Sequence, residues 1–181
     1  YEMSFENYKK AIKQNKVLPI SRYIRVASTL IKRGSFEECF FYLEKIENEF
    51  KSSFSSENEK SVLLLKAEVL KATGKPLQSI EILRTLVEKY PLEGKALIML
   101  GQNAWKQKDF VLADLYFERA AKIPEFETQA LIEHSRMLVD SRDFEKAVRL
   151  LEKAQAIEPQ ARVEKYLQSI RNLLLSSRVR L

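Results

Sequence analysis

One spacing dominates this chain: residues of matching size return every 34 positions. Three series show it: Leu63, Leu97 and Leu131; Ser79, Ala113 and Ala147; and Leu83, Phe117 and Leu151. A period of this length is typical of a pair of antiparallel helices that cannot bury its apolar face alone and therefore stacks on identical neighbours. The sequence predicts an array of helical hairpins.

The composition agrees with an all-α fold. Only 4 glycines and 5 prolines interrupt the 181 residues, and long stretches are rich in Leu, Ala, Glu and Lys, which favour helix. No apolar run approaches the roughly 18 residues needed to cross a bilayer. We therefore expect helices joined by short turns, and no transmembrane segment.

Four copies of the repeat align, at residues 20–53, 60–93, 94–127 and 128–161. The clearest copy places large and small residues at fixed points, followed by a proline: Leu97, Leu100, Gly101, Ala104, Ala113, Phe117, Ala120 and Pro124. Small residues also fill the points where paired helices should approach most closely: Ala27, Ala67 and Ser135 on first helices, and Cys39, Ser79 and Ala147 on second helices. Residues 54–59 are extra, which predicts an extended loop between the first two copies.

This pattern resembles the tetratricopeptide repeat (TPR) family. The resemblance covers most of the chain and implies a right-handed superhelical solenoid. Outside the repeats, residues 1–19 are predicted to form an N-terminal helix and linker. Residues 162–181 are predicted to form a C-terminal capping helix and a basic tail, because Val163, Leu167, Ile170 and Leu174 make one apolar stripe. The alternative is that this last helix opens a fifth repeat.

The resemblance also implies a concave groove lined by the first helix of each repeat. The residues that should face it are Ile24, Ser28, Leu64, Glu68, Lys71, Ile98, Gln102, Trp105, Ile132, Arg136 and Val139. An aliphatic row with polar neighbours would suit a peptide or an amphipathic helix of a partner protein. Two alternatives stay open: the aliphatic residues could mainly pack adjacent helices together, and Trp105 could pack between repeats instead of contacting a partner.

Catalysis finds no support in the sequence. His134 is the only histidine and Cys39 the only cysteine, which excludes a multi-histidine metal site and an internal disulfide. His134 occupies a core-facing leucine position and is expected to be packed and hydrogen-bonded. Phosphate-loop and nucleophile-elbow motifs are absent. We expect no enzyme activity, no cofactor and no metal.

The expected role is a non-catalytic protein-interaction module, as an adaptor or as a scaffold segment of a larger protein or complex. Basic clusters near both ends, at Lys9, Lys10, Lys13 and Lys16 and at Arg162, Lys165, Arg171, Arg178 and Arg180, keep nucleic-acid or anionic-surface binding as an alternative. Self-assembly into homo-oligomers is a further alternative. A cytoplasmic location is expected, although the start at Tyr1 leaves a periplasmic or other exported location open.

Overall fold

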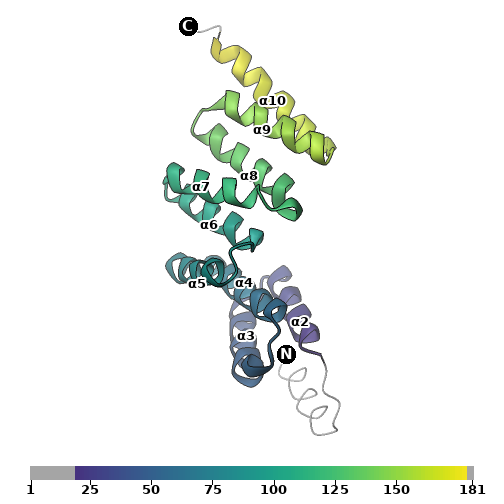
Figure 1. The fold of residues 1–181 in the computed structure, drawn as a ribbon. Helices are drawn as coiled ribbons and strands as arrows, with labels where there is room; N and C mark the ends of the chain where they lie inside the picture. The colour runs from purple at the N-terminus through teal and green to yellow at the C-terminus, as the bar shows by residue number, and fades with distance from the viewer. Residues whose placement is uncertain (1–18, 179–181) are drawn as a thin grey trace. The chain divides into compact units, whose positions relative to one another are not determined.

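The computed structural model describes residues 19–178, which form nine α-helices and two short 3₁₀ helices without a strand (Figure 1). The α-helices are α2 (Ile20–Lys32), α3 (Phe36–Phe50), α4 (Ser56–Ala72), α5 (Pro76–Lys89), α6 (Gly94–Lys106), α7 (Phe110–Ala120), α8 (Glu127–Asp140), α9 (Phe144–Ile157) and α10 (Ala161–Arg178). The 3₁₀ helices are η1 (Lys51–Ser53) and η2 (Pro124–Phe126). The all-α prediction is confirmed. The predicted N-terminal helix lies outside the described residues.

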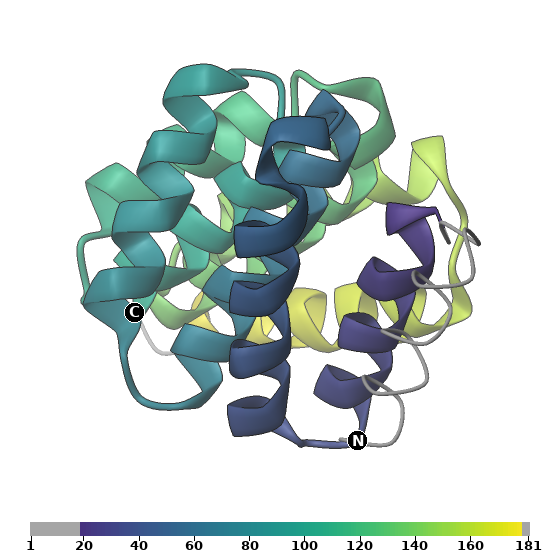
Figure 2. The same ribbon diagram turned by 90° about the horizontal axis from the view of Figure 1, so that it is seen from below.

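The described part of the chain divides into two compact units, one up to Ser79 and the other from Ile80 onward. In the first, α2 and α3 form a hairpin, visible in Figure 1 and Figure 2, and α4 packs against both helices. Its core is one apolar cluster: Tyr23, Ala27, Leu30, Cys39, Leu43, Ile46, Val62, Leu65 and Val69. In the second unit α6 pairs with α7, α8 pairs with α9, and α10 packs on α9.

The small-residue positions behave as the sequence predicts. Ala27, Cys39, Ala67 and Ser79 are all 0% exposed. The Cys39 thiol donates a hydrogen bond to the carbonyl oxygen of Ala27 (3.4 Å), and the Ser79 hydroxyl donates one to that of Ala67 (2.8 Å). A Cβ added to Gly101 would lie 2.7 Å from the Phe117 ring. Each close approach therefore requires a side chain no larger than the one present.

One prediction is wrong: residues 54–59 are not an extended loop. Helix α4 begins at Ser56, and the Ser55 hydroxyl caps it by accepting a hydrogen bond from the Asn58 backbone amide (3.2 Å). Glu57 and Glu59 lie in the first turn, where negative charge favours the positive end of the helix dipole. Most of the extra residues therefore lengthen the helix.

All four hairpin turns share one backbone geometry. Each has a residue with positive φ, namely Gly34 (76°), Gly74 (76°), Lys108 (63°) and Arg142 (65°). The amide of the next residue then donates to a carbonyl five positions earlier, as in Asp109 to Ala104 (3.0 Å) and Asp143 to Leu138 (2.8 Å). This is the Schellman ending of a helix, which glycine adopts without steric cost. Two turns therefore carry a residue that is strained there.

Replacing Arg142 with glycine is expected to stabilise the protein by about 1 kcal/mol, because it removes the left-handed strain. Urea unfolding followed by circular dichroism measures the change. The control is Arg142→Ala, which removes the same charged side chain but keeps a Cβ at positive φ. If Arg142→Ala stabilises as much as Arg142→Gly, the gain comes from the lost charge and not from the backbone.

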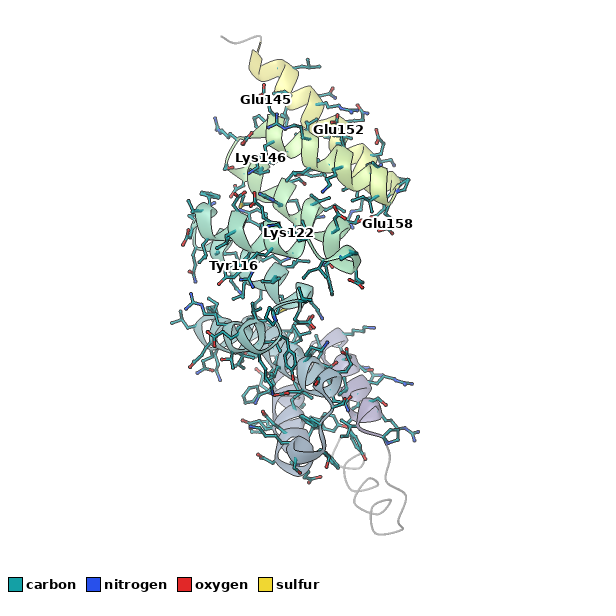
Figure 3. The ribbon with its side chains drawn as sticks, in the orientation of Figure 1. Tyr116, Lys122, Glu145, Lys146, Glu152 and Glu158 are labelled. Atoms are coloured by element: carbon teal, nitrogen blue, oxygen red, sulfur yellow. The ribbon has the colours of Figure 1, made fainter. Side chains whose placement is uncertain are left out.

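Among the residues that the structure describes, no helix is long and apolar enough to span a membrane. Helix α10 buries Val163, Leu167 and Ile170 and leaves Leu173 and Leu175 47% and 61% exposed. An ion pair between Arg171 and Glu152 of α9 (2.7 Å; Glu152 is labelled in Figure 3) also fixes it to the last hairpin. A single stripe buried against α9 fits both a capping helix and the first helix of a further repeat.

Candidate protein-interaction surface

In the first unit, five of the predicted groove residues lie on two helices that pack against each other, Ile24 and Ser28 on α2 and Leu64, Glu68 and Lys71 on α4. The Ser28 hydroxyl donates to the Ile24 carbonyl oxygen of its own helix (2.9 Å). Leu64 is only 8% exposed, so it offers a partner little contact area. Ile24, Glu68 and Lys71 are half-buried.

In the second unit, the other six lie on α6 (Ile98, Gln102 and Trp105) and α8 (Ile132, Arg136 and Val139). Ile98 is 2% exposed and belongs to the core, as the packing alternative expects. The other five are half-buried. Four of these, all except Val139, line two surface pockets, one between α6 and α8 and one between α8 and α10.

The α6–α8 pocket has a volume of about 480 Å³ and is lined by Gln102, Trp105, Lys106, Lys108, Glu133 and Asp140. Hydrogen bonds between the two helices fix its walls. The Trp105 indole N–H and the Lys108 ammonium group both donate to Asp140 Oδ2 at 2.8 Å. Gln102 Nε2 donates to Glu133 Oε2 at 3.2 Å. The indole is therefore held in one orientation at the pocket wall.

The charge state of Asp140 supports this arrangement. Its hydrogen bonds from Lys108 and Trp105 hold the pKa of the carboxyl group below its usual range. Since these bonds favour the charged form, the carboxylate remains ionised at neutral pH and continues to accept both donors.

The α8–α10 pocket has a volume of about 310 Å³ and is lined by Ile132, Arg136, Gln160, Arg162, Val163 and Tyr166. Arg136 Nη1 donates to Glu133 Oε1 at 2.6 Å. Burial raises the pKa of the Tyr166 phenol, so its hydroxyl keeps its proton at neutral pH. We call the two pockets together with their lining residues the pocket face.

Glu133 connects the two pockets. One carboxylate oxygen accepts from Gln102 in the α6–α8 pocket, and the other accepts from Arg136 in the α8–α10 pocket. Its side chain is 14% exposed. Both oxygens are thus engaged, and the positions of Gln102 and Arg136 depend on the same group.

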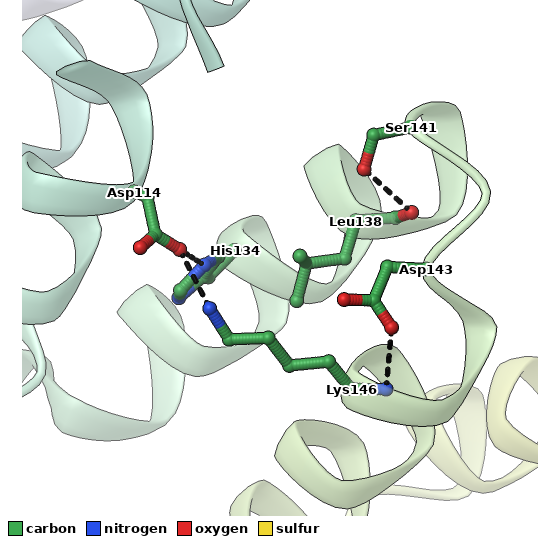
Figure 4. A network of polar contacts seen from close by, with 6 residues as sticks. All are labelled: Asp114, His134, Leu138, Ser141, Asp143 and Lys146. Atoms are coloured by element: carbon green, nitrogen blue, oxygen red, sulfur yellow. Dashed lines mark hydrogen bonds and ion pairs between the residues drawn. The ribbon is translucent and has the colours of Figure 1, made fainter. Parts of the chain in front are cut away.

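His134, a buried neighbour of this face, is packed and hydrogen-bonded, as the sequence predicts. It is 3% exposed and stacks on Phe117 with ring centroids 5.7 Å apart. Its Nε2 lies in hydrogen-bond contact with Asp114 Oδ1, which also accepts from Lys146 Nζ at 2.9 Å (Figure 4). Burial lowers the pKa of His134, with Asp114 opposing the shift. A neutral imidazole that donates from Nε2 fits this environment.

Metal chemistry has no candidate site in the described part of the chain, where no group of three or more His, Cys, Asp or Glu side chains could hold a metal ion. The thiol of Cys39 is buried, and burial raises its pKa to about 11. Because only a thiolate is strongly nucleophilic, this thiol is inert at neutral pH.

The basic clusters are only partly covered by the structure. Lys9, Lys10, Lys13 and Lys16 lie outside the described residues, as does Arg180. Of the C-terminal cluster, Arg171 is paired with Glu152 and Arg162 lines the α8–α10 pocket.

Several residues of the pocket face are missing from the sequence-based prediction, namely Lys106, Lys108, Glu133, Asp140, Gln160, Arg162, Val163 and Tyr166. The repeat period does indicate one of them: Tyr166 lies 34 positions after the predicted groove residue Ile132. This equivalence applies when the last helix is taken as the first helix of a fifth repeat, the alternative to a cap. Glu133 and Asp140 directly follow predicted groove residues and are two helical turns apart, so they share a face of α8.

No protein-family model matches the chain, and no curated protein matches its sequence. Solved structures do match in fold. MamA is 16% identical with a TM-score of 0.62, covering 87% of this chain and 86% of MamA. A kinesin light chain protein of Podospora anserina with nearly identical TPR-like repeats is 16% identical with a TM-score of 0.63, covering 90% and 96%. YrrB, a TPR protein with an unusual peptide-binding site, is 17% identical with a TM-score of 0.54, covering 90% and 97%.

These structures share the helical-repeat architecture of this chain over most of their own lengths. Their low sequence identity limits the likeness to the fold. Three features of this chain agree with that fold: the 34-residue period, the hairpin turns with one residue of positive φ, and the helix pairs. The chain has the tetratricopeptide-repeat fold.

Proposed function

We propose that this chain is a non-catalytic protein-interaction module that binds a peptide or an amphipathic helix of a partner through the pocket face, as an adaptor or scaffold segment. The observation that carries the proposal is the pair of pockets, since both are lined by groove residues expected from the sequence. The peptide-binding site named for YrrB shows that a protein of this fold binds peptides.

The α6–α8 pocket has the features of a binding hot spot. Trp105 supplies a large apolar surface at the pocket wall, and its indole is oriented by Asp140. A side chain already held in place loses little conformational entropy when a partner binds, so more of the contact energy appears as affinity. An apolar partner side chain against Trp105 suits this pocket.

The proposal predicts that Trp105→Ala weakens binding of a peptide about thirtyfold or more, because truncation of a hot-spot tryptophan costs roughly 2 kcal/mol or more. Peptides would be selected on the purified chain from a phage-displayed library of random dodecamers, synthesised, and titrated by isothermal calorimetry. Circular dichroism would confirm that the variant folds.

The matched control is Phe41→Ala, which removes an aromatic side chain that is 65% exposed on α3 and lines neither pocket. It should leave the affinity unchanged. Equal binding by wild type and Trp105→Ala would contradict the proposal. Binding that collapses steeply between low and high salt would instead favour the basic ends as the site, because counterion release dominates such binding.

A further inference from the structure

The geometry points to a carboxylate subsite in the α8–α10 pocket: we propose that it binds the side chain of a Glu or Asp residue of the partner peptide. This inference rests on the proposed function, because it names the chemistry recognised at one of the two pockets. It depends on the charges, hydrogen-bond donors and apolar walls that α8 and α10 bring together.

The first argument for the carboxylate subsite is the position and charge of Arg162. Its side chain is exposed, lines the pocket, and makes no ion pair or hydrogen bond with any of the side chains that the structure describes, which extend to residue 176. It also lies in the first turn of α10, where a positive charge opposes the helix dipole and an acidic residue would be more stable. This positive charge, which no described carboxylate balances, is available to pair with an anion from outside the chain.

The other donors complete the subsite. The Tyr166 hydroxyl stays protonated at neutral pH, because burial raises its pKa, and it has no hydrogen-bond partner among the described side chains. Gln160 adds a side-chain amide to the rim. Ile132 and Val163 form apolar walls that suit the methylene groups of a Glu or Asp side chain.

The net charge of the side chains around the α8–α10 pocket favours a carboxylate over a phosphate as the ligand. Arg136 and Arg162 bring two positive charges, but Glu133 already pairs with Arg136 at 2.6 Å. About one positive charge is left uncompensated. A carboxylate carries one negative charge, whereas a phosphoserine carries about two at neutral pH and would be left partly unpaired in this pocket.

The test uses the dodecamers selected on the full chain, synthesised with acetylated N-termini and amidated C-termini so that no terminal carboxylate remains. We expect Glu or Asp to be enriched at one position. Changing that residue to Gln should weaken binding about tenfold, the loss expected for a charge-assisted hydrogen bond. The same peptide with phosphoserine at that position should bind no better than the acidic one.

On the protein side, Arg162→Gln should weaken binding of the acidic peptide about tenfold and leave binding of the Gln-substituted peptide unchanged. It should also raise the Tm by about 1–3 °C, since it removes the charge that opposes the helix dipole. A purely structural arginine would not improve stability and impair binding together. The matched control is Arg149→Gln, the same change at an exposed position of α9 that lines neither pocket.

The outcomes are separable. Peptides that need Trp105 but show no acidic preference, or equal binding by wild type and Arg162→Gln, overturn the carboxylate subsite and leave the proposed function standing. Tighter binding of the phosphoserine peptide overturns the choice of carboxylate. If the library yields no binding peptide, both the subsite and the proposed function are contradicted.

Discussion

Phe117→Ala is expected to cost about 3–5 kcal/mol of unfolding free energy, the largest effect of any single substitution proposed for this chain. Phe117 is 0% exposed. Its ring lies where Gly101 leaves room for it and stacks on His134. Removing the ring leaves a cavity bordered by α6 and α8 that rigid helix backbones cannot fill. Urea unfolding followed by circular dichroism measures the loss.

The control is Val111→Ala, a truncation on the same helix at a side chain that is 85% exposed, which should change stability by less than about 0.5 kcal/mol. A second test uses Gly101. In the wild type, Gly101→Ala should destabilise, because the new methyl group would meet the Phe117 ring at 2.7 Å. In the Phe117→Ala background the same change should stabilise by up to about 1 kcal/mol, through helix propensity alone. If Gly101→Ala destabilises the protein in both backgrounds, the Phe117 ring is not the reason that position 101 requires glycine.

Asp114→Ala is expected to cost about 1–3 kcal/mol, because the buried Nε2–H of His134 loses its acceptor. The lower part of this range applies if water replaces the carboxylate, whose side chain is 33% exposed. The net pKa of Asp114 is lowered: burial alone would raise it, and the hydrogen bonds from Lys146 and His134 outweigh burial. The carboxylate is therefore ionised and fully able to accept at neutral pH.

The matched control is Glu118→Ala, which removes a carboxylate from an exposed position of the same helix. The double variant Asp114→Ala with His134→Leu should recover most of the loss, since replacing both partners of a buried hydrogen bond by apolar groups is nearly neutral. Leucine already occupies the equivalent position of the preceding repeat, Leu100. A double variant as unstable as Asp114→Ala would place the loss in the Lys146 ion pair instead.

The repeat period made the helix pairs and the small-residue positions predictable, because close helix packing allows few side chains at Ala27, Ala67 and Gly101. Residues 54–59 were misjudged, because six residues outside the period look alike whether they extend a loop or a helix. The Ser55 cap and the acidic first turn of α4 stabilise a helix at these residues.

The pocket face was only half predictable. Trp105 and Arg136 follow from the groove positions of the repeat, but their partners Asp140 and Glu133 depend on how far long side chains reach between neighbouring helices. The link between His134 and Asp114, 20 residues apart, likewise requires the packing of α7 on α8. Periodicity assigns a residue to a face, and only the packed structure assigns it a partner.

The shared carboxylate of Glu133 determines which side chains of the pocket face can be altered independently. Trp105 and Arg162 each line one pocket, so a substitution at either changes the walls of that pocket and leaves those of the other intact. A substitution at Glu133 releases Gln102 and Arg136 together. Trp105 and Arg162 are therefore positions at which one pocket can be altered alone, whereas any change at position 133 reaches both pockets.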